Sequence, residues 1–232
     1  MEPGEEAPIV IRDVRDDDLP AITEIYHDVV INSTATYEID PPTVSTMRDR
    51  LSALREAGFP CLVASSSSPS SSSSSSFPPD AGPGGGTVLG YAYASAFRPR
   101  PGYRFTVEQS VYVAAGARGR GVGRRLVRAL VGQCERLGFR QVVAVVGDGG
   151  PASPSVRFHE RLGFAVAGTL KGSGYKFGRW LDTVLMQLAI GGGAERPPDP
   201  ASLPETGCGI KEPGRGRLGD DDEEGVTREV DK

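Results

Sequence analysis

The stretch from Ser110 to Leu130, SVYVAAGARGRGVGRRLVRAL, limits the possible folds more than any other part of this sequence. It begins with residues typical of a buried strand, passes through a glycine-rich turn and continues into an amphipathic helical pattern. The glycines of this turn are Gly116, Gly119, Gly121 and Gly123. Because glycine has no Cβ, the backbone N–H groups of such a turn can approach a ligand at the positive end of the following helix. The pattern therefore predicts a strand, turn and helix that together bind an anion.

The arginines of the same turn indicate the kind of anion. They are Arg118, Arg120, Arg124 and Arg125. Guanidinium groups bind phosphate oxygens in pairs, so this cluster suits a pyrophosphate or several phosphates better than one carboxylate. The dinucleotide spacing G-x-G-x-x-G is not met, since the sixth residue is Arg124 counted from Gly119 and Leu126 counted from Gly121, and no G-K-[ST] of a P-loop is present. A glycine-rich turn with a solvated basic face is the alternative.

Low-complexity segments define the extent of the folded part. Residues 65–76 are eleven serines and one proline, and a Pro- and Gly-rich stretch follows as far as residue 86. Residues 191–232 contain fourteen Gly or Pro and no aromatic residue. Such compositions bury too little apolar surface to offset the entropy of ordering, so we expect disorder in 65–86, in the acidic tail 191–232 and in residues 1–8. One domain is expected over 9–190, and the roughly 160 residues left after the insertion suffice for one core.

Charge and cysteine content exclude several classes of protein. The whole chain has a net charge of −4 and the tail alone −5, so the expected domain is near neutral and gives no electrostatic reason to bind nucleic acid or an anionic membrane. Three scattered cysteines and two histidines build neither a disulfide framework nor a zinc site, so we expect no metal. No apolar run approaches the length of a membrane span and residues 1–8 are acidic, so a cytoplasmic protein is expected.

Hydrophobic periodicity predicts an α+β fold. Helices are expected over residues 16–30, 44–56, 124–137 and 155–162, and strands over 10–14, 61–64, 87–97, 105–114, 141–147, 164–170 and 182–190. In chain order this is one strand, two helices, three strands, a helix, a strand, a helix and two strands. The serine-rich insertion falls between two adjacent strands, where a connection can lengthen at low cost.

The motif R-x-x-G-x-G, at Arg118, Gly121 and Gly123 after the strand ending VYV, resembles the acyl-coenzyme A loop of the GNAT superfamily of N-acetyltransferases. The segments TVEQSVYV, VVAVVGD, PSVRFHERLGF, GYKFGRWLD and the early NSTATYEIDPPT resemble its phosphinothricin N-acetyltransferase branch, over most of residues 9–190. This resemblance implies a mixed, mostly antiparallel sheet splayed at its middle, with helices on both faces. It also implies transfer of acetyl from acetyl-CoA, as co-substrate, to the primary amine of a small molecule in a ternary complex, and a homodimer with GYKFGRWLD near the contact.

The resemblance also assigns roles to individual residues. It gives the coenzyme the following residues: Val111, Tyr112, Val113, Arg118, Gly119, Arg120, Gly121, Val122, Gly123, Arg124 and Ser155. It gives the acceptor pocket Arg100, Tyr103 and Lys176, and it makes Glu108 the general base. His159 stands where many members place a tyrosine near the departing sulfur, and an N–H near Tyr112 is left for the oxyanion.

The chemistry of amine acetylation is consistent with these roles. An α-amine has a pKa near 8 in solution, so a carboxylate such as Glu108 is needed to remove a proton before the amine attacks a thioester. A backbone N–H can stabilise the oxyanion, His159 or solvent can protonate the thiolate, and Arg100 suits an acceptor carboxylate. The alternatives are a solvated strand residue for Glu108, a satisfied core histidine for His159 and a loop residue for Arg100.

The sequence departs from the branch at two positions. Ala152 replaces an asparagine three residues before Ser155, which predicts the loss of one polar contact to the coenzyme, and His27 replaces an asparagine after Tyr26. Two other functions therefore stay open: a protein lysine or N-terminal acetyltransferase of the same fold, and a CoA-binding protein of weakened activity.

Overall fold

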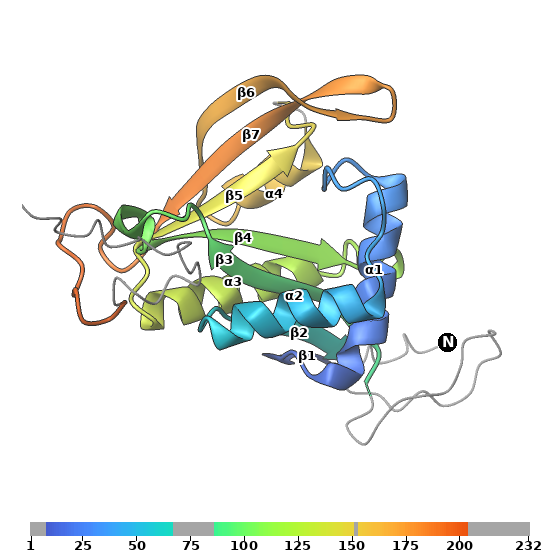
Figure 1. Ribbon diagram of the computed structural model, residues 1–232, viewed down its shortest axis with the longest axis horizontal. Helices are drawn as coiled ribbons and strands as arrows, with labels where there is room; N and C mark the ends of the chain where they lie inside the picture. Colours follow the sequence, from blue (N-terminus) through green and yellow to red (C-terminus); the bar gives the residue numbers. More distant parts are fainter. Residues whose placement is uncertain (1–7, 67–85, 151–152, 204–232) are drawn as a thin grey trace, which may run out of the picture.

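The computed structural model describes residues 8–66, 86–150 and 153–203. Its elements follow the predicted order and are α+β in class (Figure 1). The strands are β1 (Ile9–Asp13), β2 (Cys61–Ser66), β3 (Val88–Ala96), β4 (Thr106–Val113), β5 (Gln141–Gly147), β6 (Ala165–Lys176) and β7 (Arg179–Ala189). The α-helices are α1 (Leu19–Asn32), α2 (Val44–Glu56), α3 (Val122–Arg136) and α4 (Pro154–Glu160), and 3₁₀ turns span Asp16–Asp18, Pro101–Tyr103 and Ala115–Ala117. Within the described part of the chain, no helix is both long and apolar enough to span a bilayer.

The sheet is mixed and opens at its middle, as expected. Its seven strands follow the order β1-β2-β3-β4-β5-β7-β6, and only β4 and β5 are parallel neighbours. Pairing between these two strands ends at Gln109 and Ala144, although β4 continues to Val113 and β5 to Gly147. Figure 1 shows the two strands diverging towards these ends. The backbone groups of β4 that face β5 beyond Gln109 are therefore left without a strand partner.

Helices cover both faces of the sheet and give two cores. On one face, α3 and α4 pack in a cluster whose buried members include Leu126, Leu130 and Met186. On the other face, α1 and α2 bury Ile22 and Leu51 among others. Neighbouring residues of β2 alternate between the two clusters, as the two-residue repeat of a strand requires. β4 thus lies between two packed cores, and its end beyond Gln109 is held by pairing with β3.

The helix α3 shows why the predicted strand-turn-helix unit folds as it does. Its apolar side chains Leu126, Val127, Leu130 and Cys134 recur at helical spacing and are all buried. Gly121 precedes the helix with a φ of 78°, a conformation that favours glycine over residues with a Cβ. No side chain caps the first turn, so its N–H groups stay available to a ligand.

Several boundaries differ from the sequence expectation. β2 continues through Ser65, which is buried, to Ser66, because the backbone of both serines pairs with β1 and that of Ser65 also with β3. β6 and β7 are longer than predicted and form an arm with mostly exposed side chains on β6, so no buried pattern signalled it. Residues 191–203 are placed against the domain, where the carbonyl of Leu203 accepts a hydrogen bond from Arg104 Nε at 3.1 Å. Residues 1–7, 67–85 and 204–232 lie outside the described residues, so their disorder stays a prediction.

Candidate active site

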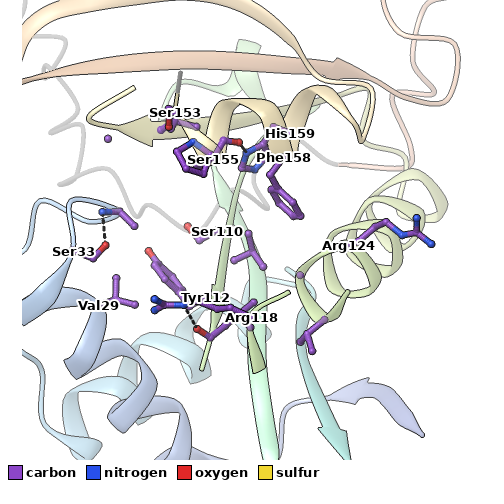
Figure 2. A pocket seen from close by; sticks show the side chains of 18 of the residues that line it. Val29, Ser33, Ser110, Tyr112, Arg118, Arg124, Ser153, Ser155, Phe158 and His159 are labelled. Atoms are coloured by element: carbon purple, nitrogen blue, oxygen red, sulfur yellow. Dashed lines mark hydrogen bonds between the residues drawn. The ribbon is translucent and has the colours of Figure 1, made fainter. Parts of the chain in front are cut away.

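A cavity of about 930 Å³ lies at the open ends of β4 and β5, within the size range of ligand pockets. Four other segments enclose it: the end of α1 with the loop after it, the glycine-rich turn, the start of α3, and α4. Figure 2 shows Ser155 and His159 of α4 on one side of β4, and Val29 and Ser33 on the other. The splay of the sheet thus creates a binding site between elements that are far apart in sequence.

Most residues predicted to bind the coenzyme line this cavity. They are Val111, Tyr112, Val113, Arg118, Gly119, Gly121, Val122, Gly123, Arg124 and Ser155, and His159 lies with them. Arg120, Glu108, Arg100, Tyr103 and Lys176 do not line it. Sequence reasoning missed several lining residues, among them Gln109, Ser110, Phe158 and the loop Ser33, Thr34 and Ala35. Gln109, Ser110, Phe158 and the loop residues all lie in segments that resemble the branch, namely TVEQSVYV, PSVRFHERLGF and NSTATYEIDPPT, so these segments were the signal that could have found them.

The glycine-rich turn has the geometry of an anion site. Gly119 and Gly121 have φ angles of 79° and 78°, so the turn depends on glycine at both positions. Arg118 Nε donates to the carbonyl of Val113 at 3.3 Å, and its guanidinium lies 3.5 Å from the carboxylate of Asp28 on α1. Both partners hold the Arg118 side chain on the side of α1, as Figure 2 shows, and the N–H groups of the uncapped first turn of α3 follow directly in the chain. A diphosphate fits this combination of N–H groups and guanidinium.

The side chain of Tyr112 packs against a core, which favours the predicted role through its backbone. Its ring packs edge-on against Tyr26, with centroids 5.0 Å apart, and lies 5.2 Å from Tyr91. Burial raises the pKa of the Tyr112 hydroxyl well above its usual value, so the side chain stays neutral. β4 pairs with β3 here but has no strand partner on the side that faces β5, which supports a ligand hydrogen bond to the main chain of residues 111–113 on that side.

Glu108 lies on the same face of β4 as Ser110 and Tyr112, both of which line the cavity. It is half-buried, and burial raises the pKa of its carboxyl, an effect that Arg98 partly opposes. A raised pKa brings a carboxylate closer to the range in which it works as a general base. Sequence reasoning missed Arg98, whose proximity to Glu108 results from the chain reversal between β3 and β4.

Arg100 and Tyr103 lie in the exposed loop between β3 and β4, outside the cavity lining. Tyr103 packs edge-on against Phe97 with ring centroids 5.9 Å apart. Arg100 and Tyr103 immediately precede β4, which begins at Thr106 and contains Glu108. Their role towards an acceptor stays a prediction.

His159 is a buried ring with a partner on each nitrogen. Nδ1 lies 2.8 Å from the carbonyl oxygen of Ser155, which can only accept, so Nδ1 carries the proton. Nε2 lies 2.7 Å from Nε2 of Gln109 and therefore accepts from that amide. Burial lowers the pKa of the imidazole, which keeps it neutral. This arrangement favours the satisfied core histidine over the proton donor to a departing thiolate.

A buried neutral histidine predicts a pH dependence of stability. The unfolded chain takes up a proton at His159 as pH falls through about 6.5, whereas the folded state resists it, so the free energy of unfolding should fall from pH 7 to pH 5. We expect His159→Asn to flatten this part of the curve in urea titrations, besides lowering stability overall. His27→Asn, at an exposed position on α1, is the control that should keep the wild-type slope. Equal slopes for wild type and His159→Asn would contradict a neutral buried ring.

Other candidate groups have no place in the chemistry of this site. Cys61 and Cys134 lie in the two cores, and burial raises the pKa of each thiol to about 12, so neither supplies a thiolate. Among the described residues, no group of three or more His, Cys, Asp or Glu could hold a metal ion. Ala152 lies outside the described residues, and so does any effect of its replacing an asparagine.

A mixed sheet that opens between two parallel strands, with an anion-binding turn at the start of the next helix, defines a class of enzymes that use acyl-coenzyme A. The model of the acetyltransferase (GNAT) family matches residues 70–164. The chain belongs to this family, and acetyl-CoA is its co-substrate.

Relatives make the assignment more specific. A phosphinothricin N-acetyltransferase of Alcaligenes faecalis is 46% identical over 183 residues, which are 79% of this chain and 83% of that protein. An L-methionine sulfoximine/L-methionine sulfone acetyltransferase of Pseudomonas paraeruginosa is 39% identical over 78% of this chain and 94% of its own length. The crystal structure of a phosphinothricin acetyltransferase from Sinorhizobium meliloti in complex with acetyl-CoA is 42% identical, with a TM-score of 0.73, and the match covers 85% of this chain and 97% of that one.

Proposed function

We propose that this enzyme transfers acetyl to the primary amine of a small amino-acid-like acceptor, of the phosphinothricin, methionine sulfone or methionine sulfoximine type. The observation that carries the proposal is that one cavity is lined both by the anion-binding turn and by the loop of Ser33, Thr34 and Ala35. Two substrates can therefore lie in it together, as direct transfer in a ternary complex requires. The names of the relatives supply the class of acceptor.

The coenzyme is assigned to the half of the cavity formed by β4 and α3. Arg118, Arg124 and the N–H groups of residues 119–123 bind the diphosphate, and the unpaired backbone of residues 111–113 binds the chain that carries the thioester. Bound there, acetyl-CoA supplies an activated acyl group. Ser155, at the start of α4, closes this half of the cavity from the other side (Figure 2).

Glu108 prepares the amine. Directly or through a water molecule, its carboxylate takes a proton from the ammonium form of the acceptor, so that the nitrogen lone pair can attack the carbonyl carbon. A backbone N–H near Tyr112 stabilises the negative charge that develops on the oxygen. The oxyanion then collapses, the C–S bond breaks, and the attacking nitrogen releases its second proton to solvent to leave the amide. The thiolate takes a proton from solvent, since neutral His159 has both nitrogens occupied.

A thiol-release assay with acetyl-CoA tests this function. We expect turnover with phosphinothricin, methionine sulfone or methionine sulfoximine and little with lysine-containing peptides. Acetylated peptides without acetylated amino acids would favour a protein acetyltransferase instead. Heat of acetyl-CoA binding without turnover on any amine would point to a CoA-binding protein, and no heat signal at millimolar acetyl-CoA would reject the coenzyme site as well.

We further propose a homodimer formed through the arm of β6 and β7. Its tip exposes Tyr175, Phe177 and Trp180, which are 55%, 56% and 68% accessible. Exposed aromatic groups on one surface are typical of an interface. Trp180→Lys should convert a dimer to a monomer in light scattering, whereas Lys171→Ser on the same arm should not. A monomeric wild type would reject the dimer.

We place the enzyme in the cytoplasm. Cys61 and Cys134 are unpaired thiols, which is typical of a reducing compartment. Cell fractionation that recovers the activity with the membranes or outside the cell would contradict this location.

A further inference from the structure

The loop between α1 and α2 forms the wall of the cavity opposite α4, and it contains no helix or strand of its own. Its residues Ser33, Thr34 and Ala35 line the cavity, just beyond the end of α1, where Asp28 lies 3.5 Å from Arg118. A wall without regular structure needs other contacts to hold one shape. These contacts come from the arm of β6 and β7, more than a hundred residues away in sequence.

Lys176, at the end of β6, makes the first contact. Its side chain is 5% exposed, and Nζ donates to the carbonyl oxygens of Ser33 and Thr36, both at 2.9 Å. The carboxylate that acts on the Lys176 ammonium group by charge is that of Glu38. Glu38 forms its ion pair with Arg50, at 2.7 Å. Burying an ammonium group is costly unless polar groups satisfy it, and here the loop backbone does so. Lys176 therefore lies behind the wall and does not line the cavity.

Tyr37 makes the second contact from the loop side. Its hydroxyl lies 2.8 Å from Thr183 Oγ1 and 3.2 Å from the carbonyl oxygen of Asp182, both on β7. Its ring covers Gly174 so closely that a Cβ there would come within 2.4 Å of a ring carbon. Gly147 at the end of β5 likewise leaves room for the carbonyl of Thr34, which would lie 2.3 Å from a Cβ. The glycines allow the close approach, and the polar groups fix it.

We propose that Lys176 and Tyr37 are positioning residues that fix the acceptor-facing wall and thereby set the affinity for the acceptor amine, without touching it. The inference rests on the proposed function for the identity of the acceptor. It replaces the direct contact between Lys176 and the acceptor that the sequence suggested. The hydrogen bonds of Lys176 and Tyr37 go to the loop and to β7 and none goes to the glycine-rich turn, so we expect coenzyme binding to change less than acceptor binding when either residue is replaced.

The test compares Lys176→Met with Lys171→Met. Both positions lie on β6, but Lys171 is exposed and binds only Asp182 among the described residues, so its variant is a matched control. Tyr37→Phe, which keeps the ring over Gly174 and removes only the hydroxyl, is a milder second variant should Lys176→Met fold poorly. Three quantities are measured: KM and kcat for the acceptor, the Kd of acetyl-CoA by calorimetry, and hydrogen exchange of the backbone amides of residues 33–38.

For Lys176→Met we expect the acceptor KM to rise about tenfold, which corresponds to the net free energy of one or two hydrogen bonds. The changes in kcat and in the Kd of acetyl-CoA should be smaller. Tyr37→Phe should raise KM less, and both variants should speed exchange in residues 33–38. An unchanged acceptor KM, or equal losses of acceptor and coenzyme binding, would overturn the inference. If the wild type acetylates no amine, the proposed function fails. The positioning role is then judged from hydrogen exchange and from the Kd of acetyl-CoA. It is overturned if residues 33–38 of Lys176→Met exchange no faster than those of Lys171→Met.

Discussion

Glu108→Gln is expected to lower kcat about 100-fold or more, the usual contribution of a general base. Glutamine keeps the size and polarity of the side chain but cannot accept the proton that the ammonium group must lose. Acetyl-CoA should bind with the wild-type Kd, because Glu108 is not among the residues that line the cavity. The thiol-release assay and calorimetry measure the two quantities separately.

The pH profile distinguishes loss of a base from loss of fold. Burial raises the pKa of Glu108, so in the wild type kcat should rise with pH as the carboxyl ionises. The variant has no such group, and the difference between the two enzymes should be largest above that pKa and smallest below it. Glu160→Gln, at an exposed position on α4, is the control and should keep the wild-type profile. An unchanged profile in Glu108→Gln would mean that another group removes the proton.

Arg118→Gln combined with Arg124→Gln is expected to raise the Kd of acetyl-CoA about 100-fold, since a hydrogen bond to a charged group contributes about 1.5–3 kcal/mol. Both residues line the cavity, and we propose that both bind the diphosphate. Neither is buried, so the fold should tolerate the change. Calorimetry with acetyl-CoA measures the Kd, and thermal unfolding checks the fold.

The matched control is Arg128→Gln, one turn further along α3 at an exposed position outside this cavity. It should leave the Kd unchanged. Salt gives a second check, because the wild-type Kd should rise with ionic strength and that of the double variant should rise less. Wild-type affinity in the double variant would place the diphosphate elsewhere and remove the basis of the proposed function.

The order of the elements and the position of the anion-binding turn could be predicted because their signals are local. The apolar stripe of α3 and the glycines that precede it lie within a few turns of chain, and neighbours along the chain fix their conformation. The β6 and β7 arm was predicted too short, because most of its β6 side chains are exposed and show no buried pattern.

The sequence alone thus determined the fold class and the strand-turn-helix unit, since both depend on residue types at short spacing. Glu108 as the base follows from the family resemblance and stays a prediction. Tertiary structure decided the state of His159, whose Nε2 meets an amide fifty residues away, and the place of Lys176, whose partner Ser33 is 143 residues away. The physical reason is that protonation and positioning depend on burial and on hydrogen-bond partners. Those are set only when distant segments pack together.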